Sequence, residues 1–266
     1  MDLALAGKRA IVTGGTGGLG IAIARQLALE GVRTAVCSRS LDRAKDAIAA
    51  LGVPGADGLL MPAQVELKDP DSVTALVEAV AAEFGGVDIV VNSGAEVSGN
   101  APEDFAHVTD ELILSSFEDK FIGILRVCRA TVPLMRAQGF GRIINLAGST
   151  AREAGSISAG ARNSAVVNLT KALSRELGRD GITVNAIHPF TTKTGNLGPR
   201  LERMAARRDV TADEHLKALS ARTSLGRLVT AEEIADFVAF LASPRSVALT
   251  GEVLALTGGL GTAVYF

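Results

Sequence analysis

Residues 9–20 are Arg9-Ala-Ile-Val-Thr-Gly-Gly-Thr-Gly-Gly-Leu-Gly20, and the amphipathic segment Ile21-Ala-Ile-Ala-Arg-Gln-Leu-Ala-Leu-Glu30 follows directly. The short apolar run predicts a buried strand, the glycines predict a tight turn, and the spacing after Gly20 predicts a helix. Glycine is needed where the backbone turns sharply and a pyrophosphate approaches more closely than a Cβ would allow. The helix N-terminus offers unpaired N–H groups to that phosphate. The stretch therefore predicts a nucleotide-binding unit.

The spacing of these glycines is typical of one family. A GxGxxG match begins at Gly15, but this general dinucleotide pattern is weak evidence alone because many glycine-rich turns contain it. The longer pattern TGxxxGxG, which begins at Thr13, resembles that of the short-chain dehydrogenase/reductase family. The alternative is a strand-to-helix turn without a ligand, but such a turn needs fewer than the five glycines present here.

The resemblance extends over essentially the whole chain and implies an α/β fold. We expect residues 1–266 to form a single dinucleotide-binding domain, a three-layer doubly wound parallel sheet of the Rossmann type, with a substrate lid at about 195–227. Apolar runs and helical patterns alternate along the chain, as a parallel sheet requires. The expected strands are 9–13, 32–38, 58–65, 87–92, 141–148, 182–188 and 250–259, and the expected long helices are 21–30, 41–51, 71–84, 111–135, 161–178 and 231–242.

Composition narrows the classes of partner. With 47% hydrophobic and 21% charged residues, the chain can bury a large core. A net charge of −2 disfavours nucleic acid and anionic membranes as partners, which leaves a small-molecule substrate. Cys37 and Cys128 are too few for a disulfide framework and form no metal-binding motif, so a reducing, cytoplasmic compartment and no metal are expected. The N-terminus lacks a signal peptide, and no apolar run is long enough to span a membrane.

Ser38 and Arg39 predict the preferred cofactor. Arg39 lies 19 residues after Gly20, close to the position that contacts the adenosine ribose in these folds. An acid there would accept a hydrogen bond from the 2′-hydroxyl of NAD, whereas a guanidinium beside a hydroxyl suits a 2′-phosphate. NADP(H) is therefore favoured over NAD(H). The alternative is a solvated surface arginine, and Gly17 stands where many NADP-binding relatives carry a second basic residue.

Other parts of the cofactor site are implied by the resemblance. Gln64 stands where the family usually has an aspartate that contacts the adenine amine, and its carbonyl could accept the same bond. Asn92-Ser-Gly-Ala95 replaces Asn-Asn-Ala-Gly, and the segment from Pro189 to Thr194 resembles the one that holds the nicotinamide carboxamide, with Phe190 for glycine. The expected cofactor-binding residues are Gly14, Thr16, Gly18, Leu19, Gly20, Ser38, Arg39, Gln64, Val65, Asn92, Gly94, Pro189, Thr192 and Thr194.

The family's reactive groups are missing. Its members usually transfer hydride with an Asn-Ser-Tyr-Lys tetrad, in which a tyrosinate is the acid/base and a lysine depresses the tyrosine pKa. Surrounding landmarks place Lys120 at the asparagine position, Gly148 at the serine position, Ala159 at the tyrosine position and Asn163 at the lysine position. Ser149 adjoins the serine position and could serve if the loop shifts.

No change of alignment recovers the tyrosine, because the only one in the chain is the penultimate residue, Tyr265. Tails in this family sometimes reach a neighbouring subunit, so Tyr265 entering that subunit's site is an alternative. Lysine and asparagine have exchanged positions, which suggests that Lys120 projects its ammonium into the cleft from the opposite wall. Burial would then lower its pKa and make it a usable acid/base. Otherwise Lys120 pairs with an acid such as Glu118 or one from a partner subunit.

Other polar candidates are expected at the mouth of the cleft, namely Asn145, Ser149, Arg152, Glu153, Arg162, His188 and Lys193. His188 ends a strand beside Pro189, where a lone histidine is more often structural than catalytic. Arg152 and Glu153 are adjacent and are expected to form a solvated pair.

These features predict an NADP(H)-dependent oxidoreductase that acts on a small carbonyl or enoyl substrate, with Lys120, Ser149 and Asn163 as substitute catalytic residues. Reduction of an activated double bond tolerates loss of the tyrosine best, because it needs hydride delivery and an oxyanion donor. The alternatives are non-redox chemistry on the same fold, such as dehydration or cyclisation, and a cofactor-binding protein without turnover. By resemblance, a homotetramer or homodimer packed through helices 111–135 and 161–178 is expected.

Overall fold

The computed structural model describes residues 1–266 except 56–57, 95–104, 155, 263 and 265–266. Ala95 and Tyr265 therefore lie outside the described residues. Within the described part, seven parallel strands form one sheet in the order β3-β2-β1-β4-β5-β6-β7. The strands are β1 (Arg9–Thr13), β2 (Arg33–Ser38), β3 (Leu60–Gln64), β4 (Ile89–Asn92), β5 (Gly141–Leu146), β6 (Ile182–Pro189) and β7 (Val253–Leu256).

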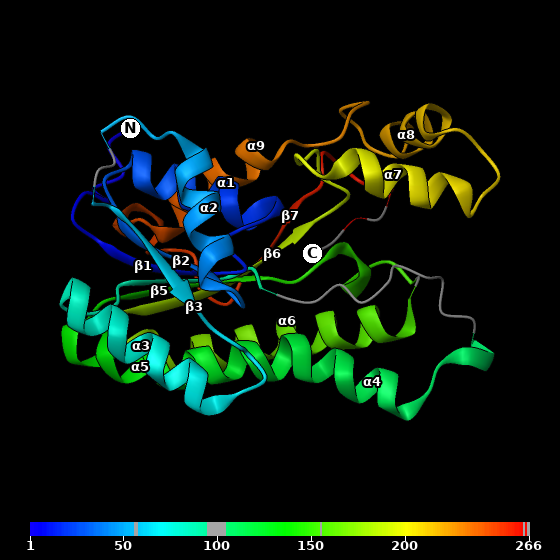
Figure 1. The fold of residues 1–266 in the computed structure, drawn as a ribbon. Helices are drawn as coiled ribbons and strands as arrows, with labels where there is room; N and C mark the ends of the chain where they lie inside the picture. Colours follow the sequence, from blue (N-terminus) through cyan, green and yellow to red (C-terminus); the bar gives the residue numbers. More distant parts are fainter. Residues whose placement is uncertain (56–57, 95–104, 155, 263, 265–266) are drawn as a thin grey trace.

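Helices cover both faces of this sheet (Figure 1), which confirms the predicted doubly wound α/β fold. They are α1 (Gly18–Leu29), α2 (Leu41–Leu51), α3 (Pro70–Phe84), α4 (Asp110–Phe117), α5 (Gly123–Gln138), α6 (Ile157–Leu177), α7 (Leu197–Ala206), α8 (Ala212–Ala221) and α9 (Ala231–Ala242). One core lies between the sheet and α3, α5 and α6, and the other lies between the sheet and α1 and α9. Alternate strand residues serve the two cores, as the pleat of a strand requires.

The turn between β1 and α1 depends on its glycines. Gly14 has a φ of +63°, and a Cβ on it would lie 2.7 Å from the Cα of Gly94. A Cβ on Gly20 would lie 2.2 Å from the carbonyl oxygen of Gly14. Both contacts are far too short, so side chains at these two positions would push the turn away from α1 and from the end of β4. The first turn of the fold is thus fixed by backbone packing, as its sequence predicts.

The long helix expected at 111–135 is interrupted. α4 ends at Phe117, a π-helical turn covers Glu118–Ile122, and α5 begins at Gly123. A π turn holds an extra residue, and such turns are frequent at functional sites. Gly123 fits this junction because a Cβ on it would lie 3.1 Å from the Cβ of Leu67. The interruption puts Lys120, which is buried, in the middle of the π turn.

Helix α6 begins earlier than the expected 161 because Ser156 caps it. The Ser156 side chain accepts a hydrogen bond from the backbone N–H of Ala159. The last strand is shorter than expected, covering Val253–Leu256 within the predicted 250–259. Region 195–227 contains α7 and α8, which share a small apolar cluster of Leu197, Leu201, Leu219 and Leu228, with Phe190 packed against it. Figure 1 shows this pair of helices at one end of the molecule.

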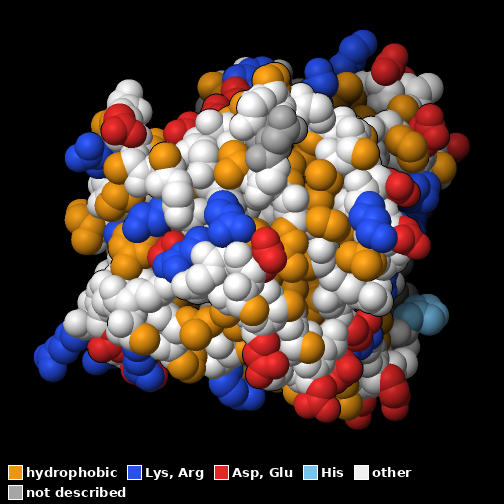
Figure 2. All heavy atoms as spheres, turned by 60° about the vertical axis from the view of Figure 1, so that its left-hand side comes forward, with side chains coloured by type: hydrophobic (Ala, Val, Ile, Leu, Met, Phe, Trp, Pro, Cys, Tyr) orange, Lys and Arg blue, Asp and Glu red, His pale blue; other side chains and the backbone are white. Residues whose placement is uncertain are grey.

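The surface in Figure 2 carries acidic and basic side chains on the same face with apolar groups between them. Such a face has no extended field of one sign, in keeping with the net charge of −2. Throughout the described residues, every helix is too short or too polar to traverse a lipid bilayer.

Replacing Gly20 with alanine should destabilise the protein, because the new methyl group would overlap the Gly14 carbonyl. We expect the free energy of unfolding, measured by urea denaturation, to fall by about 1–3 kcal/mol, as for other overpacked sites. Gly17 is the matched control, because a Cβ there meets no atom within 4 Å and its φ is −153°. Equal effects of Gly20→Ala and Gly17→Ala would contradict this account of the turn.

Candidate active site

The N-terminus of α1 has the features of an anion-binding site. Gly17 caps this helix with extended backbone and no side-chain hydrogen bond, and the first turn contains no acid. By contrast, Ser40 caps α2 and Asp69 caps α3 through their side chains. A Cβ on Gly17 or Gly18 would meet nothing within 4 Å, so the space beside the turn is open. Open space and uncapped N–H groups at one helix end fit the pyrophosphate of a dinucleotide.

The other expected cofactor residues gather at the carboxyl ends of strands, where ligands bind in such sheets. Ser38 ends β2 and Gln64 ends β3, and these two residues are paired in the sheet register. The Gln64 Nε2 donates to the carbonyl oxygen of exposed Arg39 over 3.0 Å, and the N–H of buried Val65 donates to the Ser38 carbonyl over 2.8 Å. These contacts bring the four adenosine-side residues together.

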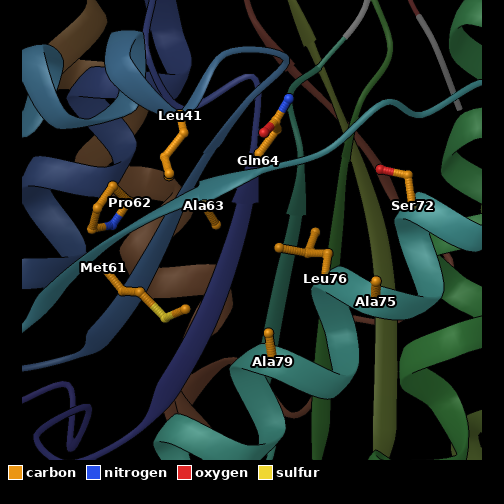
Figure 3. A pocket seen from close by; sticks show the side chains of 9 residues that line it. All are labelled: Leu41, Met61, Pro62, Ala63, Gln64, Ser72, Ala75, Leu76 and Ala79. Carbon is orange, nitrogen blue, oxygen red and sulfur yellow. The ribbon is translucent and has the colours of Figure 1, made fainter.

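A separate hollow of about 330 Å³ borders this region at the edge strand β3 (Figure 3). Gln64 lies at one end, and the remaining lining comes from the edge of β3, from Leu41 and from one side of α3. The lining is mainly apolar carbon. Since β2, β1, β4 and β5 separate β3 from β6 in the sheet, the hollow is distinct from the nicotinamide side of the site.

Asn92 ends β4 and Gly94 lies two residues beyond it, so both are at the carboxyl ends of the strands. Asn92 makes its contact through the side chain and Gly94 through the backbone. The side chain of Asn92 is buried, and its Nδ2 donates to the Asn145 Oδ1 over 2.8 Å. It therefore ties β4 to β5, while the Asn92 Oδ1 has no partner among the described residues. A contact between Asn92 and a cofactor stays a prediction. The N–H of Gly94 donates to the Thr13 Oγ1 over 3.0 Å, which holds the backbone after β4 against the glycine turn.

Pro189 ends β6, which lies two strands beyond β4, and Thr192 and Thr194 follow it. The Thr192 hydroxyl donates to the Phe190 carbonyl over 2.9 Å, and the Thr194 hydroxyl donates to the Asn196 Oδ1 over 2.7 Å. These bonds fix the segment as a compact turn beside the end of β6. The residues expected at the adenosine, at the pyrophosphate and at the nicotinamide therefore lie in that order along the carboxyl ends of the strands, from β3 and β2 through β1 to β6. This is the order expected for an extended dinucleotide.

Lys120 and Asn163, the two exchanged residues, contact each other. The Lys120 Nζ donates to the Asn163 Oδ1 over 2.8 Å and to the Ala147 carbonyl oxygen over 2.5 Å. The Asn163 Nδ2 in turn donates to the Thr150 Oγ1 over 2.7 Å. The π turn, the end of β5 and α6 are thus joined through the amine of Lys120.

Gly148 is part of the same arrangement. A Cβ on Gly148 would lie 2.7 Å from the Asn163 Nδ2, so any side chain there would displace the Asn163 amide. Glycine at 148 and asparagine at 163 are therefore sterically coupled. Ser149, the suggested substitute, begins the 3-10 turn Ser149–Ala151, and its carbonyl accepts from the Arg152 N–H. The hydrogen bonds of the Lys120 network do not include Ser149.

The alternative in which Lys120 pairs with Glu118 is wrong. Glu118 pairs with Arg126 over 2.6 Å, and Asp119 pairs with Lys68 over 2.6 Å. Among the described residues, no carboxylate lies within ion-pair distance of Lys120. Its amine is therefore buried among neutral acceptors.

The expected pair of Arg152 and Glu153 is also absent from the described ion pairs. Glu153 pairs with Arg222, whose guanidinium stacks on the Phe190 ring. The Arg152 guanidinium donates to the Val253 carbonyl over 3.0 Å. These two neighbours therefore point to different parts of the fold.

Burial and the nearby charge of Arg162 lower the pKa of Lys120 from 10.5 to about 7. The hydrogen bonds can be made in both protonation states. A neutral amine has two N–H donors, and the described acceptors, on Ala147 and Asn163, can accept both. The ammonium form has a third N–H, for which no acceptor is found among the described residues.

His188 is 1% exposed, and neither ring nitrogen has a hydrogen-bond partner among the described residues. Burial, followed by the charges of Arg152 and Lys120, lowers its pKa to about 4. The lack of hydrogen-bond partners for the His188 ring could not be predicted from the sequence.

The sequence also does not reveal the roles of Thr150 and the Ala147 carbonyl in the Lys120 network, because a single hydroxyl and a backbone oxygen carry no motif. Among the described residues, no three His, Cys, Asp or Glu side chains are grouped to hold a metal.

Comparison with known proteins shows similarity over nearly the whole chain. The family described as enoyl-(acyl carrier protein) reductase matches residues 14–261. The short-chain reductase protein NovJ of Streptomyces niveus is 34% identical over 251 residues, which cover 94% of this chain and 92% of that protein. The 3-oxoacyl-(acyl-carrier-protein) reductase FabG of Escherichia coli is 32% identical over 259 residues, covering 96% and 97%.

Solved structures agree in fold. A variant of the actinorhodin polyketide ketoreductase with NADPH matches with a TM-score of 0.87 and 32% identity, covering 96% of this chain and 98% of that one. L-sorbose reductase from Gluconobacter frateurii, complexed with NADPH and L-sorbose, matches with a TM-score of 0.90 and 28% identity, covering 99% and 100%.

Replacing Lys120 with methionine should change how stability depends on pH. Between about pH 7 and pH 10.5 the unfolded chain binds a proton at Lys120 that the folded chain does not, so wild-type stability gains from rising pH. We expect the difference in unfolding free energy, wild type minus Lys120→Met, to increase over that interval in urea denaturation. Lys171→Met, which removes an exposed amine, is the control. A difference that stays constant with pH would contradict the lowered pKa.

Proposed function

Because the chain belongs to the short-chain dehydrogenase/reductase family of oxidoreductases, we propose that it transfers hydride between NADP(H) and a small carbonyl or enoyl substrate at a non-standard active site. The observation that carries this proposal is the buried amine of Lys120, bonded to Asn163 and Ala147. It provides a titratable N–H group in a site from which the tyrosine is missing, since Ala159 stands at that position.

The cofactor part of the proposal is supported by the fit of the residues. The uncapped N-terminus of α1 would hold the pyrophosphate, Ser38 and Arg39 would hold the 2′-phosphate, and the segment from Pro189 to Thr194 would hold the nicotinamide carboxamide. Two of the matched structures are described as complexes with NADPH, which favours NADP(H) here. When bound, NADPH supplies the hydride.

Lys120 would then handle the charge and the proton. When hydride reaches a carbonyl or an activated double bond, negative charge develops on the substrate oxygen, and an ammonium in a buried site stabilises that charge strongly. The third N–H of the Lys120 ammonium is the donor for this oxygen, because the described contacts account for the other two. An amine with a pKa of about 7 can give up that proton and regain it at neutral pH.

Asn163 acts as a positioning residue in this scheme. Its Oδ1 accepts from Lys120 while its Nδ2 is held by Thr150, so the amine is aimed by a fixed amide. Ser149 follows Gly148 at the end of β5 and remains a candidate for a further substrate contact. Lys120, Asn163 and Ser149 together replace the family's tetrad in this proposal.

We further propose the remaining features by family resemblance. Residues 1–266 would form one domain in which α7 and α8, within 195–227, cover the substrate. The chain would act in the cytoplasm as a homotetramer or homodimer, packed through α4, α5 and α6. Leu114 on α4 and Ile157 on α6 are exposed apolar residues that such packing would cover.

Arg39→Ala should weaken NADPH binding about tenfold or more and leave NADH binding nearly unchanged, because charge-assisted bonds to a phosphate are strong. The measurement is a titration followed by nicotinamide fluorescence. Arg43→Ala, which removes another exposed arginine near the same strand end, is the matched control. Equal losses for both coenzymes would contradict the role of Arg39, and no binding of either coenzyme by the wild type would overturn the proposed function.

Lys120→Met should lower the rate of hydride transfer by about a hundredfold or more, the usual effect of removing an acid/base group. NADPH affinity should change little, because Lys120 lies apart from the phosphate cradle. NADPH oxidation with a panel of carbonyl and enoyl substrates measures the rate, and Lys171→Met is the control. A variant with full activity would remove Lys120 from the mechanism. If the wild type binds NADPH tightly but turns over no substrate, the alternative function, a cofactor-binding protein without catalysis, would be favoured. Alanine at the expected tyrosine position, Ala159, also favours that alternative.

A further inference from the structure

We propose that Asp119 is a positioning residue for Lys120, because its ion pair with Lys68 holds the π turn in the conformation that directs the Lys120 amine. This inference deepens the proposed function and rests on it for the part that Lys120 takes in hydride transfer. The position of the amine can be measured without any substrate, so the two proposals are tested separately.

The π turn Glu118–Ile122 is held on one side through Lys120. The Lys120 amine donates to Asn163 on α6 over 2.8 Å and to the Ala147 carbonyl, just beyond β5, over 2.5 Å. Helices α3, α5 and α6 lie in one layer on the same face of the sheet (Figure 1), and the π turn leads directly into α5. Within this layer, Lys120 joins the turn to α6.

Asp119, the residue directly before Lys120, holds the turn on a different side. Its Oδ1 lies 2.6 Å from the Nζ of Lys68, in the segment between β3 and α3. The Asp119 side chain is 5% exposed and that of Lys68 is 44% exposed, so the ammonium reaches a buried carboxylate from the surface. A buried charge left without its partner is strongly unfavourable, so this pair restrains the turn more than an ion pair between two exposed side chains would.

Two further contacts join the segment between β3 and α3 to the same turn. The Arg126 Nη1 donates to the Leu67 carbonyl over 3.0 Å and lies 2.6 Å from the Oε1 of Glu118, the first residue of the turn. A Cβ on Gly123, which follows the turn, would lie 3.1 Å from the Leu67 Cβ. The segment therefore reaches both ends of the turn as well as its middle.

A π turn needs restraints of this kind. The π conformation is rare, and an α-helical turn at the same place would hold one residue fewer. One residue corresponds to about 100° of rotation around a helix axis. Conversion to an α-helical turn would therefore move Asp119 or Lys120 away from its partners. The contacts on the two sides together fix the direction in which the Lys120 amine points.

The experiment compares the Lys120 amine in the wild type and in Lys68→Met/Asp119→Asn, a double variant that removes both charges and leaves the local net charge unchanged. The protein carries ¹³C at the ε carbons of its lysines, and Lys120→Met identifies the Lys120 signal. Burial, followed by the charge of Arg162, lowers the pKa of Lys120 to about 7. We expect an NMR titration of the double variant to show this pKa raised towards the ordinary 10.5, because a displaced amine is less buried.

Lys45→Met/Asp42→Asn is the matched control, because these residues form a lysine–aspartate pair on α2. Lys68→Arg keeps the charge and should keep the wild-type titration of Lys120. An unchanged Lys120 pKa in the variant that lacks the pair with Asp119, or an equal rise in the control, overturns the positioning role.

Lys68→Met alone replaces the double variant should that protein fail to fold, since the Lys68 side chain is partly exposed. Hydrogen exchange of residues 118–123, measured by mass spectrometry, should then be about fivefold faster than in the wild type, the usual effect of losing one hydrogen bond. Exchange at the wild-type rate would show that Lys68 does not hold the turn.

Activity separates this proposal from the proposed function. With NADPH and a substrate, kcat of the double variant should be about tenfold lower, because a small displacement of a reacting group slows the reaction. Reduction uses the Lys120 proton, so wild-type kcat should decline as the pH rises through about 7, and this decline should move to higher pH in the variant. A raised Lys120 pKa with unchanged kcat confirms the positioning role and removes Lys120 from the proposed reaction. A wild type without turnover counts against the proposed function alone, because the NMR titration needs no substrate.

Discussion

The hydrogen bond from Lys120 to Asn163 is the contact on which the packing of the candidate active site depends. It joins the π turn to α6, and the second bond, to Ala147, adds the end of β5. The amine is buried without a carboxylate among the described residues, so its protonation is costly and its pKa falls towards neutrality. Gly148 leaves the space that the Asn163 amide needs. A single buried amine thereby joins three elements of the fold at this place.

The two halves of the site differ in how far they follow from sequence. The glycine turn uses residues close together in the chain, so residues 9–20 alone predict the phosphate cradle, and the alternation of apolar runs predicts the parallel sheet. The half that we propose to be reactive joins Lys120, Ala147 and Asn163, which come from three parts of the fold far apart in sequence. Family resemblance supplied their positions, but their contacts depend on tertiary packing.

The two wrongly predicted ion pairs, those of Glu118 and Glu153, have one physical cause. Nearness in sequence favours Lys120 and Arg152 as the partners of Glu118 and Glu153, yet these acids pair with Arg126 and Arg222. The π turn and the end of α8 set the directions of the side chains concerned. A π turn leaves no mark in apolar periodicity, so the sequence of 111–135 predicts one unbroken helix. The ring nitrogens of His188 lack hydrogen-bond partners among the described residues because of the packing of β5, β6 and β7, which the sequence does not reveal either.

The close approach of Gly148 to Asn163 makes the residues around the Lys120 amine dependent on one another. Serine at 148 would collide with the Asn163 amide, and lysine at 163 would bring a second ammonium to the place where the Lys120 amine now binds. A substitution at either position therefore calls for a compensating change at another residue of the network, so these positions are expected to vary together and not singly.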